Sequence, residues 1–208
     1  MLNGYSAYIF DIDGTILDTA PRILSSIKLS LEQSGVNVPY DKITKDLIGP
    51  KIVDILNILG ISASSEQKDE IVKKFRSLYD NDPVSDTIIY PQALEIINQA
   101  KASQCPLFVA TNKPMAPTIK VLKAFGLNFF KDVYCPNKYE DRILTKAKML
   151  EEIITKNNLN ASKVLMIGDT KGDLDAAKQT GCKFAFASWG YEKDKEVIEK
   201  LSDIVLRE

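Results

Sequence analysis

The amino-acid sequence predicts an α/β fold, a doubly wound parallel sheet into which a small, all-helical domain is inserted. Two observations lead to this prediction. Short apolar runs rich in β-formers alternate with helical segments along the chain. Strands and helices in this alternation build right-handed, mostly parallel sheets. Finally, roughly ninety residues separate the first apolar run from the second, although a simple crossover needs only about a dozen.

Six short apolar runs have the length and composition of strands that are buried on both faces. They are Tyr5–Phe10, Pro106–Thr111, Lys131–Cys135, Lys163–Ile167, Lys183–Ala187 and Ile204–Leu206. The segments between them show helical spacing. Ala93, Ile96, Ile97 and Ala100, for example, follow the i, i+3, i+4, i+7 pattern of one helix face.

The long interval after the first strand contains helical patterns, and we expect no strand in it. One apolar face is formed by Ile23, Ile27 and Leu31, a second by Ile52, Leu56 and Leu59, and a third by Ile71, Phe75 and Leu78. The pairs Asp82-Pro83 and Tyr90-Pro91 mark the return to the main domain. We therefore predict a helical domain over residues 17–84, and a core domain made of residues 1–16 and 85–208.

Composition excludes several classes of protein. The chain has 208 residues, 45% of them hydrophobic, so it can bury a core. Its net charge of −1 and lack of a basic stripe indicate neither a nucleic-acid partner nor a membrane partner. The N-terminus resembles no signal peptide, and no apolar run reaches spanning length. Three widely spaced cysteines favour a reduced, cytoplasmic compartment.

The chain has no histidine, so proton transfer near neutral pH falls to other side chains, and a metal site would be rich in oxygen.

The first candidate motif is Asp11-Ile12-Asp13-Gly14-Thr15, which directly follows an apolar run. In an extended backbone, the side chains of Asp11 and Asp13 would lie on the same side, at the carboxyl end of the strand. Ligands of open α/β sheets collect at this end. An isolated Asp-x-Asp is more often a pair of solvated loop acids. The complete motif at the end of a strand favours an anion or metal site instead.

Two further segments supply groups that suit phosphate. Thr111 and Asn112 end the second strand, where a hydroxyl and backbone N–H groups can hold a phosphate oxygen, although these residue types also cap helices. Lys146 begins a helical segment and could offset the charge of nearby carboxylates. Lys148 is so close that spacing alone does not choose between the two lysines.

The fourth motif is Gly168-Asp169-x-x-x-Asp173, which ends the strand that begins near Lys163. Carboxylates are the ligands that Mg²⁺ prefers, and Mg²⁺ usually keeps open positions for substrate phosphate. Asp173 could alternatively stabilise the N-terminus of the next helix by its charge. Asp169 at the strand tip has no comparable structural role, so it is the stronger candidate for a metal ligand.

Together, in this order along the chain, the four motifs resemble those of the haloacid dehalogenase superfamily. The chain is most similar to its phosphoglycolate phosphatase-like members, which have a Rossmann-like core and a helical cap of the C1 type. The resemblance covers essentially the full length. It extends to Leu17-Asp18-Thr19, Ile48-Gly49-Pro50 and Ser188-Trp189-Gly190-Tyr191. Many relatives have Lys-Pro at the third motif where this chain has Lys146-Ala147, a form also common in the family. Lys113-Pro114 directly follows the second motif and is not the third-motif lysine.

The resemblance implies a role for each matching residue. Asp11 would be the nucleophile and a Mg²⁺ ligand. Asp13 would be the general acid and base, and its backbone carbonyl would also bind the metal. Thr111, Asn112 and Lys146 would bind phosphate, and Lys146 would also pair with Asp11. Asp169 would bind Mg²⁺, with Asp173 in the outer shell or alongside Lys146.

These roles predict a Mg²⁺-dependent phosphatase that acts on a small phosphorylated metabolite, with phosphoglycolate as the leading substrate. A sugar phosphomutase would share the same core residues, and a pyrophosphatase or a nucleotidase ranks below both. A response-regulator receiver would be shorter and would lack the helical insert. A cysteine-based phosphatase needs Cys-x5-Arg, and Cys135 has Asp141 at that position. A catalytically silent relative would usually lack a core acid, whereas this chain has them all. The sequence assigns no oligomeric state.

Overall fold

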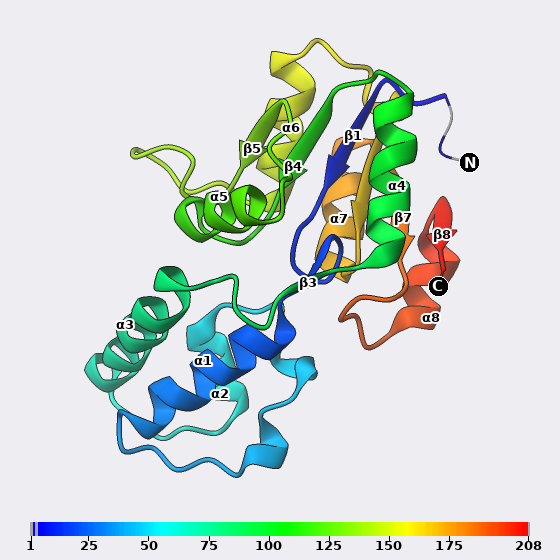
Figure 1. Cartoon of the computed structure of the whole chain (residues 1–208). Helices are drawn as coiled ribbons and strands as arrows, with labels where there is room; N and C mark the ends of the chain where they lie inside the picture. Colours follow the sequence, from blue (N-terminus) through cyan, green and yellow to red (C-terminus); the bar gives the residue numbers. More distant parts are fainter. Residues whose placement is uncertain (1, 3, 208) are drawn as a thin grey trace. The chain divides into compact units, whose positions relative to one another are not determined.

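The computed structural model describes Leu2 and residues 4–207 (Figure 1). Met1, Asn3 and Glu208, which belong to the predicted core domain, lie outside the described residues. The chain divides into two compact units. One contains the residues up to Asp18 and those from Ile88 onward, and the other is Thr19–Thr87. None of the helices among the described residues is long and apolar enough to cross a membrane.

The first unit is built on a six-stranded sheet in which every pairing is parallel. Its strand order is β5-β4-β1-β6-β7-β8. The strands are β1 (Ala7–Phe10), β4 (Leu107–Ala110), β5 (Asp132–Tyr134), β6 (Val164–Gly168), β7 (Lys183–Ala187) and β8 (Ile204–Leu206). Each lies within or next to a predicted run, and the predicted α/β fold class is confirmed.

Helices cover both faces of this sheet, as expected of a doubly wound fold. They are α4 (Pro91–Ala102), α5 (Met115–Ala124), α6 (Lys146–Lys156), α7 (Lys171–Thr180) and α8 (Lys195–Leu201), with a short 3₁₀ turn η3 (Ala161–Lys163). Ile9 and Phe108 pack with Met149 of α6 and Leu174 of α7 in one core cluster. Figure 1 shows α4 on the opposite face. Both faces are therefore buried, which explains why β1, β4 and β6 are apolar throughout.

Two short strands lie in the interval where no strand was predicted, and that expectation was wrong. β2 (Leu17–Asp18) pairs antiparallel with β3 (Ile88–Ile89) at the two ends of the inserted segment. Strands of two residues show neither a run of β-formers nor an alternating pattern. Their pairing joins residues about seventy positions apart, so local sequence gives no sign of it.

The second unit is helical, with α1 (Ala20–Glu32), the 3₁₀ turns η1 (Tyr40–Lys42) and η2 (Lys45–Leu47), α2 (Ile52–Ile58) and α3 (Ser65–Asn81). Its core is formed by apolar side chains from all three helices, including Ile27, Leu56 and Phe75. The Arg22 guanidinium of α1 donates hydrogen bonds to the backbone carbonyls of Leu78 and Asp82, at 2.9 and 2.6 Å. These bonds satisfy carbonyls at the carboxyl end of α3 and join it to α1.

Candidate active site

The candidate residues gather at the carboxyl ends of three adjacent strands. Asp11 directly follows β1, Thr111 follows β4, and Asp169 follows β6. These strands are neighbours in the sheet and run parallel, so the residues that follow them meet at the same edge. In open α/β sheets, this edge is where ligands bind.

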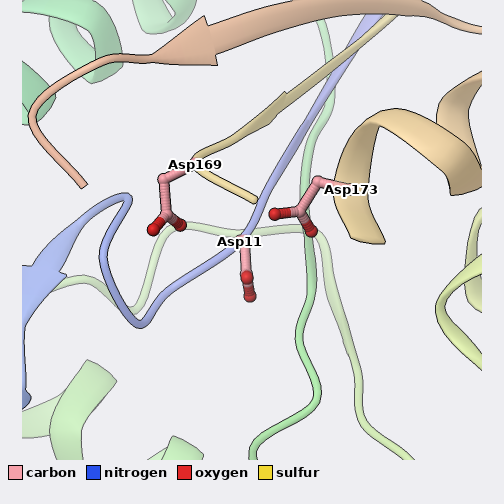
Figure 2. A group of neighbouring side chains, drawn as sticks. All are labelled: Asp11, Asp169 and Asp173. Atoms are coloured by element: carbon pink, nitrogen blue, oxygen red, sulfur yellow. The ribbon is translucent and has the colours of Figure 1, made fainter. Parts of the chain in front are cut away.

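Three carboxylates converge at this edge. Asp11, Asp169 and Asp173 are all buried, and each offers an oxygen within 4.8 Å of the others. Figure 2 shows the side chains of Asp169 and Asp173 on two sides of Asp11. Oxygen ligands at such spacing suit a hard divalent cation.

One buried ammonium partly balances this charge. Lys146, the first residue of α6, places its Nζ 2.9 Å from Asp11 Oδ2 and 2.7 Å from Asp173 Oδ1, and donates to the Ala110 carbonyl at 3.1 Å. Lys148 instead has a side chain that is 62% exposed and pairs with Glu151 on the helix surface. Of the two lysines between which spacing did not choose, Lys146 is therefore the one that reaches the acids.

The electrostatics of the cluster indicate a strongly negative site. The pKa of Asp11 is raised to about 6, because the effects of burial and of the nearby Asp173 charge outweigh the lowering effect of Lys146. Burial, together with the charges of Asp173 and Asp11, also raises the pKa of Asp169 well above its ordinary value. For Lys146, the opposing effect of burial is outweighed by Asp11 and Asp173, so its pKa is raised and it stays charged. Lys146 pairs with two of the three buried acids, Asp11 and Asp173, and the remaining negative charge fits a bound cation.

Asp169 is fixed in place by contacts that sequence reasoning did not predict. Its Oδ1 accepts a hydrogen bond from Thr15 Oγ1 at 2.8 Å, and its Oδ2 accepts one from the Tyr191 backbone N–H at 2.8 Å. The Trp189 indole in turn donates to the Thr15 carbonyl at 3.1 Å. A Cβ at Gly14, whose φ is +84°, would lie only 2.1 Å from Asp169 Oδ2. The glycine therefore leaves space for the carboxylate.

Asp173 contacts both the start of α7 and the lysine of the acid cluster. It is the third residue of α7, where its Oδ2 accepts hydrogen bonds from the Thr170 N–H at 3.1 Å and from Thr170 Oγ1 at 2.7 Å. This arrangement satisfies the first turn of the helix. Its Oδ1 pairs with Lys146. The same side chain thus starts α7 and aims a charged oxygen at the acid cluster.

Asp13 has a partner that the motif analysis missed. Its Oδ1 lies 2.8 Å from Nζ of Lys113, which follows Thr111 and Asn112 in the loop after β4. A sequence signal existed, because β4 was predicted to be a core strand and the loop after it would meet the loop after β1. The residue was considered only as the third-motif lysine, which it is not.

The two phosphate-binding candidates differ in exposure. Thr111 is buried, its N–H donates to the Tyr134 carbonyl at 3.0 Å, and its Oγ1 accepts from the Lys113 N–H at 3.3 Å. Asn112 is exposed to solvent. Both lie in the turn that follows β4, at the ligand-binding edge of the sheet.

The sequence matches a known protein family and is similar to several characterised proteins. Residues 8–187 match the model of the haloacid dehalogenase-like hydrolase family. A phosphoglycolate phosphatase from Aquifex aeolicus is 29% identical over 189 residues, which cover 89% of this chain and 85% of the relative. Tyrosine-protein kinase PtkA from Mycobacterium tuberculosis is 25% identical over 198 residues, which cover 95% of this chain and 67% of the kinase.

Solved structures show the same fold. A haloacid dehalogenase-like hydrolase from Streptococcus pneumoniae superimposes with a TM-score of 0.86 at 23% identity, covering 99% of this chain and 95% of its own. The structure of PtkA from Mycobacterium tuberculosis superimposes with a TM-score of 0.78 at 22% identity, covering 93% of this chain and 88% of its own.

Proposed function

Because the chain belongs to the haloacid dehalogenase-like hydrolase family, we propose that it is a Mg²⁺-dependent phosphatase that forms a phospho-aspartyl intermediate on Asp11. The observation that carries this proposal is the position of Asp11. It follows the central strand β1 directly, and its Oδ2 is 2.9 Å from the buried ammonium of Lys146. A carboxylate held in this way is a nucleophile whose charge is kept near neutral pH.

The reaction divides into two displacements. In the first, an Asp11 oxygen attacks phosphorus, the bond from phosphorus to the ester oxygen breaks, and Asp13 gives its proton to the leaving alcohol. In the second, Asp13 takes a proton from water, which attacks the phosphorus and releases inorganic phosphate and the Asp11 carboxylate. Asp13 suits both steps because it lies two residues after Asp11 and is partly exposed, whereas the other acids near Asp11 are buried.

The residues present fit a divalent metal ion. The carboxylates of Asp11 and Asp169 would be its side-chain ligands, and the family resemblance adds the backbone carbonyl of Asp13. Asp173 would lie beside them through its contact with Lys146. When bound there, Mg²⁺ would reduce the repulsion between the Asp11 carboxylate and an anionic phosphate.

Phosphate would be held by groups from two loops. Thr111 and the backbone of Asn112 would bind phosphate oxygens at the end of β4, and Lys146 would contribute its positive charge. The helical unit, residues 19–87, would act as the cap that selects the substrate and excludes water.

Phosphoglycolate is our leading candidate substrate, because it is the substrate in the name of relatives such as that from Aquifex aeolicus. A sugar phosphomutase, a pyrophosphatase or a nucleotidase would use the same core residues. Transfer to a protein tyrosine is the activity in the name of the mycobacterial relative.

Phosphate release from a panel of phosphorylated metabolites, with Mg²⁺ and with a chelator, tests the proposal. We expect release from a small monoester that depends on Mg²⁺, and a loss on the order of 10³-fold or more in Asp11→Asn. Full activity in the chelator would contradict the metal assignment. Isomer formation without phosphate release would identify a mutase, and phosphorylated tyrosine would identify a kinase.

A further inference from the structure

Tyr191, in the loop after β7, contacts both a proposed metal ligand and one of the two short strands. Its backbone N–H donates to Asp169 Oδ2 at 2.8 Å, and its side-chain hydroxyl donates to Asp18 Oδ1 at 3.0 Å. Asp18 is the last residue of β2. The backbone and the side chain of Tyr191 therefore bind different parts of the first unit, and the residue joins Asp169 to β2.

The Asp169 carboxylate is held at both of its oxygens. Oδ1 accepts from Thr15 Oγ1 at 2.8 Å, and Oδ2 accepts from the Tyr191 N–H. Thr15 lies shortly before Asp18, so the Tyr191 hydroxyl returns to the segment that supplies the other donor. These bonds fix the plane of the carboxylate, and Mg²⁺ demands near-ideal geometry from its ligands. A shift of the Tyr191 backbone would therefore change how well Asp169 can bind the metal.

The loop after β7 fits closely around Asp169. A Cβ on Gly190 would lie 2.2 Å from Asp169 Cβ, so the loop backbone rests directly against this side chain. The neighbouring Trp189 is buried, and its indole donates to the Thr15 carbonyl at 3.1 Å. Its ring also packs near that of Tyr90, which follows β3, with the ring centroids 6.2 Å apart. The loop thus contacts residues at both short strands as well as the proposed metal ligand.

β2 and β3 are the points at which the chain leaves the first unit and returns to it. Asp18 is the last residue of this unit before the helical unit, Ile88 is the first residue after it, and the two residues pair across the strands. The Tyr90 N–H adds a hydrogen bond to the Ile16 carbonyl at 3.0 Å. Two strands of this length form only a marginal pair by themselves, so side-chain contacts from the β7 loop help to hold them together.

We propose that Tyr191 is a positioning residue that couples Mg²⁺ binding at Asp169 to the pairing of β2 with β3. This inference rests on the proposed function, because that function assigns Asp169 as a metal ligand. Asp169 in its metal-binding position fixes the Tyr191 backbone, and the Tyr191 hydroxyl then holds Asp18 within β2. In the other direction, a paired β2 fixes Tyr191 and so orients Asp169. Coupling of this kind is reciprocal, so each end can be measured from the other.

The first measurement is the Kd of Mg²⁺, by calorimetric titration of the protein without substrate. Tyr191→Phe removes the hydroxyl and keeps the backbone N–H, and we expect it to raise the Kd at least about fivefold. Tyr139→Phe is the matched control, because it removes a hydroxyl that donates to Glu152 at 2.6 Å, and it should change the Kd by less than about twofold. Asp18→Ala should also weaken binding, and the double variant should bind no more weakly than the weaker single variant.

The second measurement is hydrogen exchange of the backbone amides in β3, which contains none of the proposed metal ligands. In the wild-type protein, saturating Mg²⁺ should slow this exchange at least about fivefold more than it slows exchange in β5, which reports any general gain in stability. In Tyr191→Phe saturated with Mg²⁺, the extra slowing should fall below about twofold. A residue with a purely structural role would instead speed the exchange of β3 equally with and without the metal.

Three results would overturn the inference. The first is a folded Tyr191→Phe that binds Mg²⁺ as tightly as the wild type, and the second is a fully additive loss of affinity in the double variant. The third is a wild-type protein in which saturating Mg²⁺ slows exchange in β3 no more than in β5, a result that does not depend on the folding of any variant. A wild type that binds no Mg²⁺ would overturn the inference together with the proposed metal site, and its own titration distinguishes this case.

Discussion

Replacing Lys146 with methionine would leave Asp11 and Asp173 buried without the ammonium that pairs with both. The Lys146 side chain is 8% exposed and lies 2.9 and 2.7 Å from the two carboxylates. Coulomb's law with an effective dielectric constant near 20 gives about 6 kcal/mol for each contact, and the desolvation of the lysine offsets much of it. Removing one partner of a buried ionic group costs about 3–5 kcal/mol, and we expect a loss of stability of this size at pH 8.

This loss should depend on pH. The pKa of Asp11 is about 6 in the presence of Lys146, and it will rise further when the cation is removed. At pH 5, Asp11 is largely protonated and needs no positive partner, so the variant should lose less stability than at pH 8. The remaining loss at pH 5 comes from the contact between Lys146 and Asp173.

The assay is urea unfolding of the metal-free protein, in a chelator, at pH 5 and pH 8. Lys148→Met is the matched control, because it removes the same side chain two residues away, where the lysine is exposed and pairs with Glu151 on the helix surface. The control should change stability by less than about 0.5 kcal/mol at both pH values. Equal losses in the two variants, or a loss in Lys146→Met that does not change with pH, would refute the reasoning.

Two further predictions concern the same acids. The pKa of Asp11 in the folded protein is about 6, against an ordinary value of 3.8, so protonation of this carboxyl group stabilises the folded state. This stabilisation of the metal-free protein is therefore complete below about pH 4 and is lost as the pH rises through about 6, by at most about 3 kcal/mol. Urea unfolding from pH 4 to 8 measures it, Asp11→Asn should show a smaller slope, and added Mg²⁺ should stabilise most above pH 6. Gly14→Ala would force a Cβ to within 2.1 Å of Asp169 Oδ2 at a φ of +84°, whereas Gly60→Ala meets nothing within 4 Å at a φ of +70°. Both substitutions should lower the stability of the protein by about 1–2 kcal/mol, because alanine disfavours a positive φ. Only Gly14→Ala should also lose Mg²⁺ affinity in a calorimetric titration. Equal metal affinity in the two variants would contradict the packing argument.

The sheet could be predicted because its strands are buried on both faces. Such strands read as short apolar runs, and the run that ends at Phe10 is followed directly by Asp11. The position of this acid at the carboxyl end of the strand can therefore be predicted without knowing which other residues it contacts. Asp169 after β6 follows the same rule.

The contacts that complete the site are of another kind. Thr15 reaches Asp169 across 154 positions, and Lys113 reaches Asp13 across 100. Periodicity and local motifs describe neighbours along the chain. The strand pattern indicates that the loops after β1 and β4 lie at the same edge of the sheet, but not which of their side chains meet. Even the choice between Lys146 and Lys148 depended on how α6 starts, because Thr145 caps the helix and directs the first lysine inward.

The central claim is that a phosphoryl group is transferred to Asp11, and trapping that species tests it most directly. Wild-type protein would be mixed with Mg²⁺ and its best monoester substrate, quenched in acid within milliseconds, and examined by mass spectrometry of the intact protein and its peptides. We expect one added phosphoryl group on the peptide that contains Asp11, in amounts that disappear on neutral hydroxylamine treatment and in Asp11→Asn. Phosphate release without any phosphorylated protein, or a phosphoryl group on another residue, would contradict it.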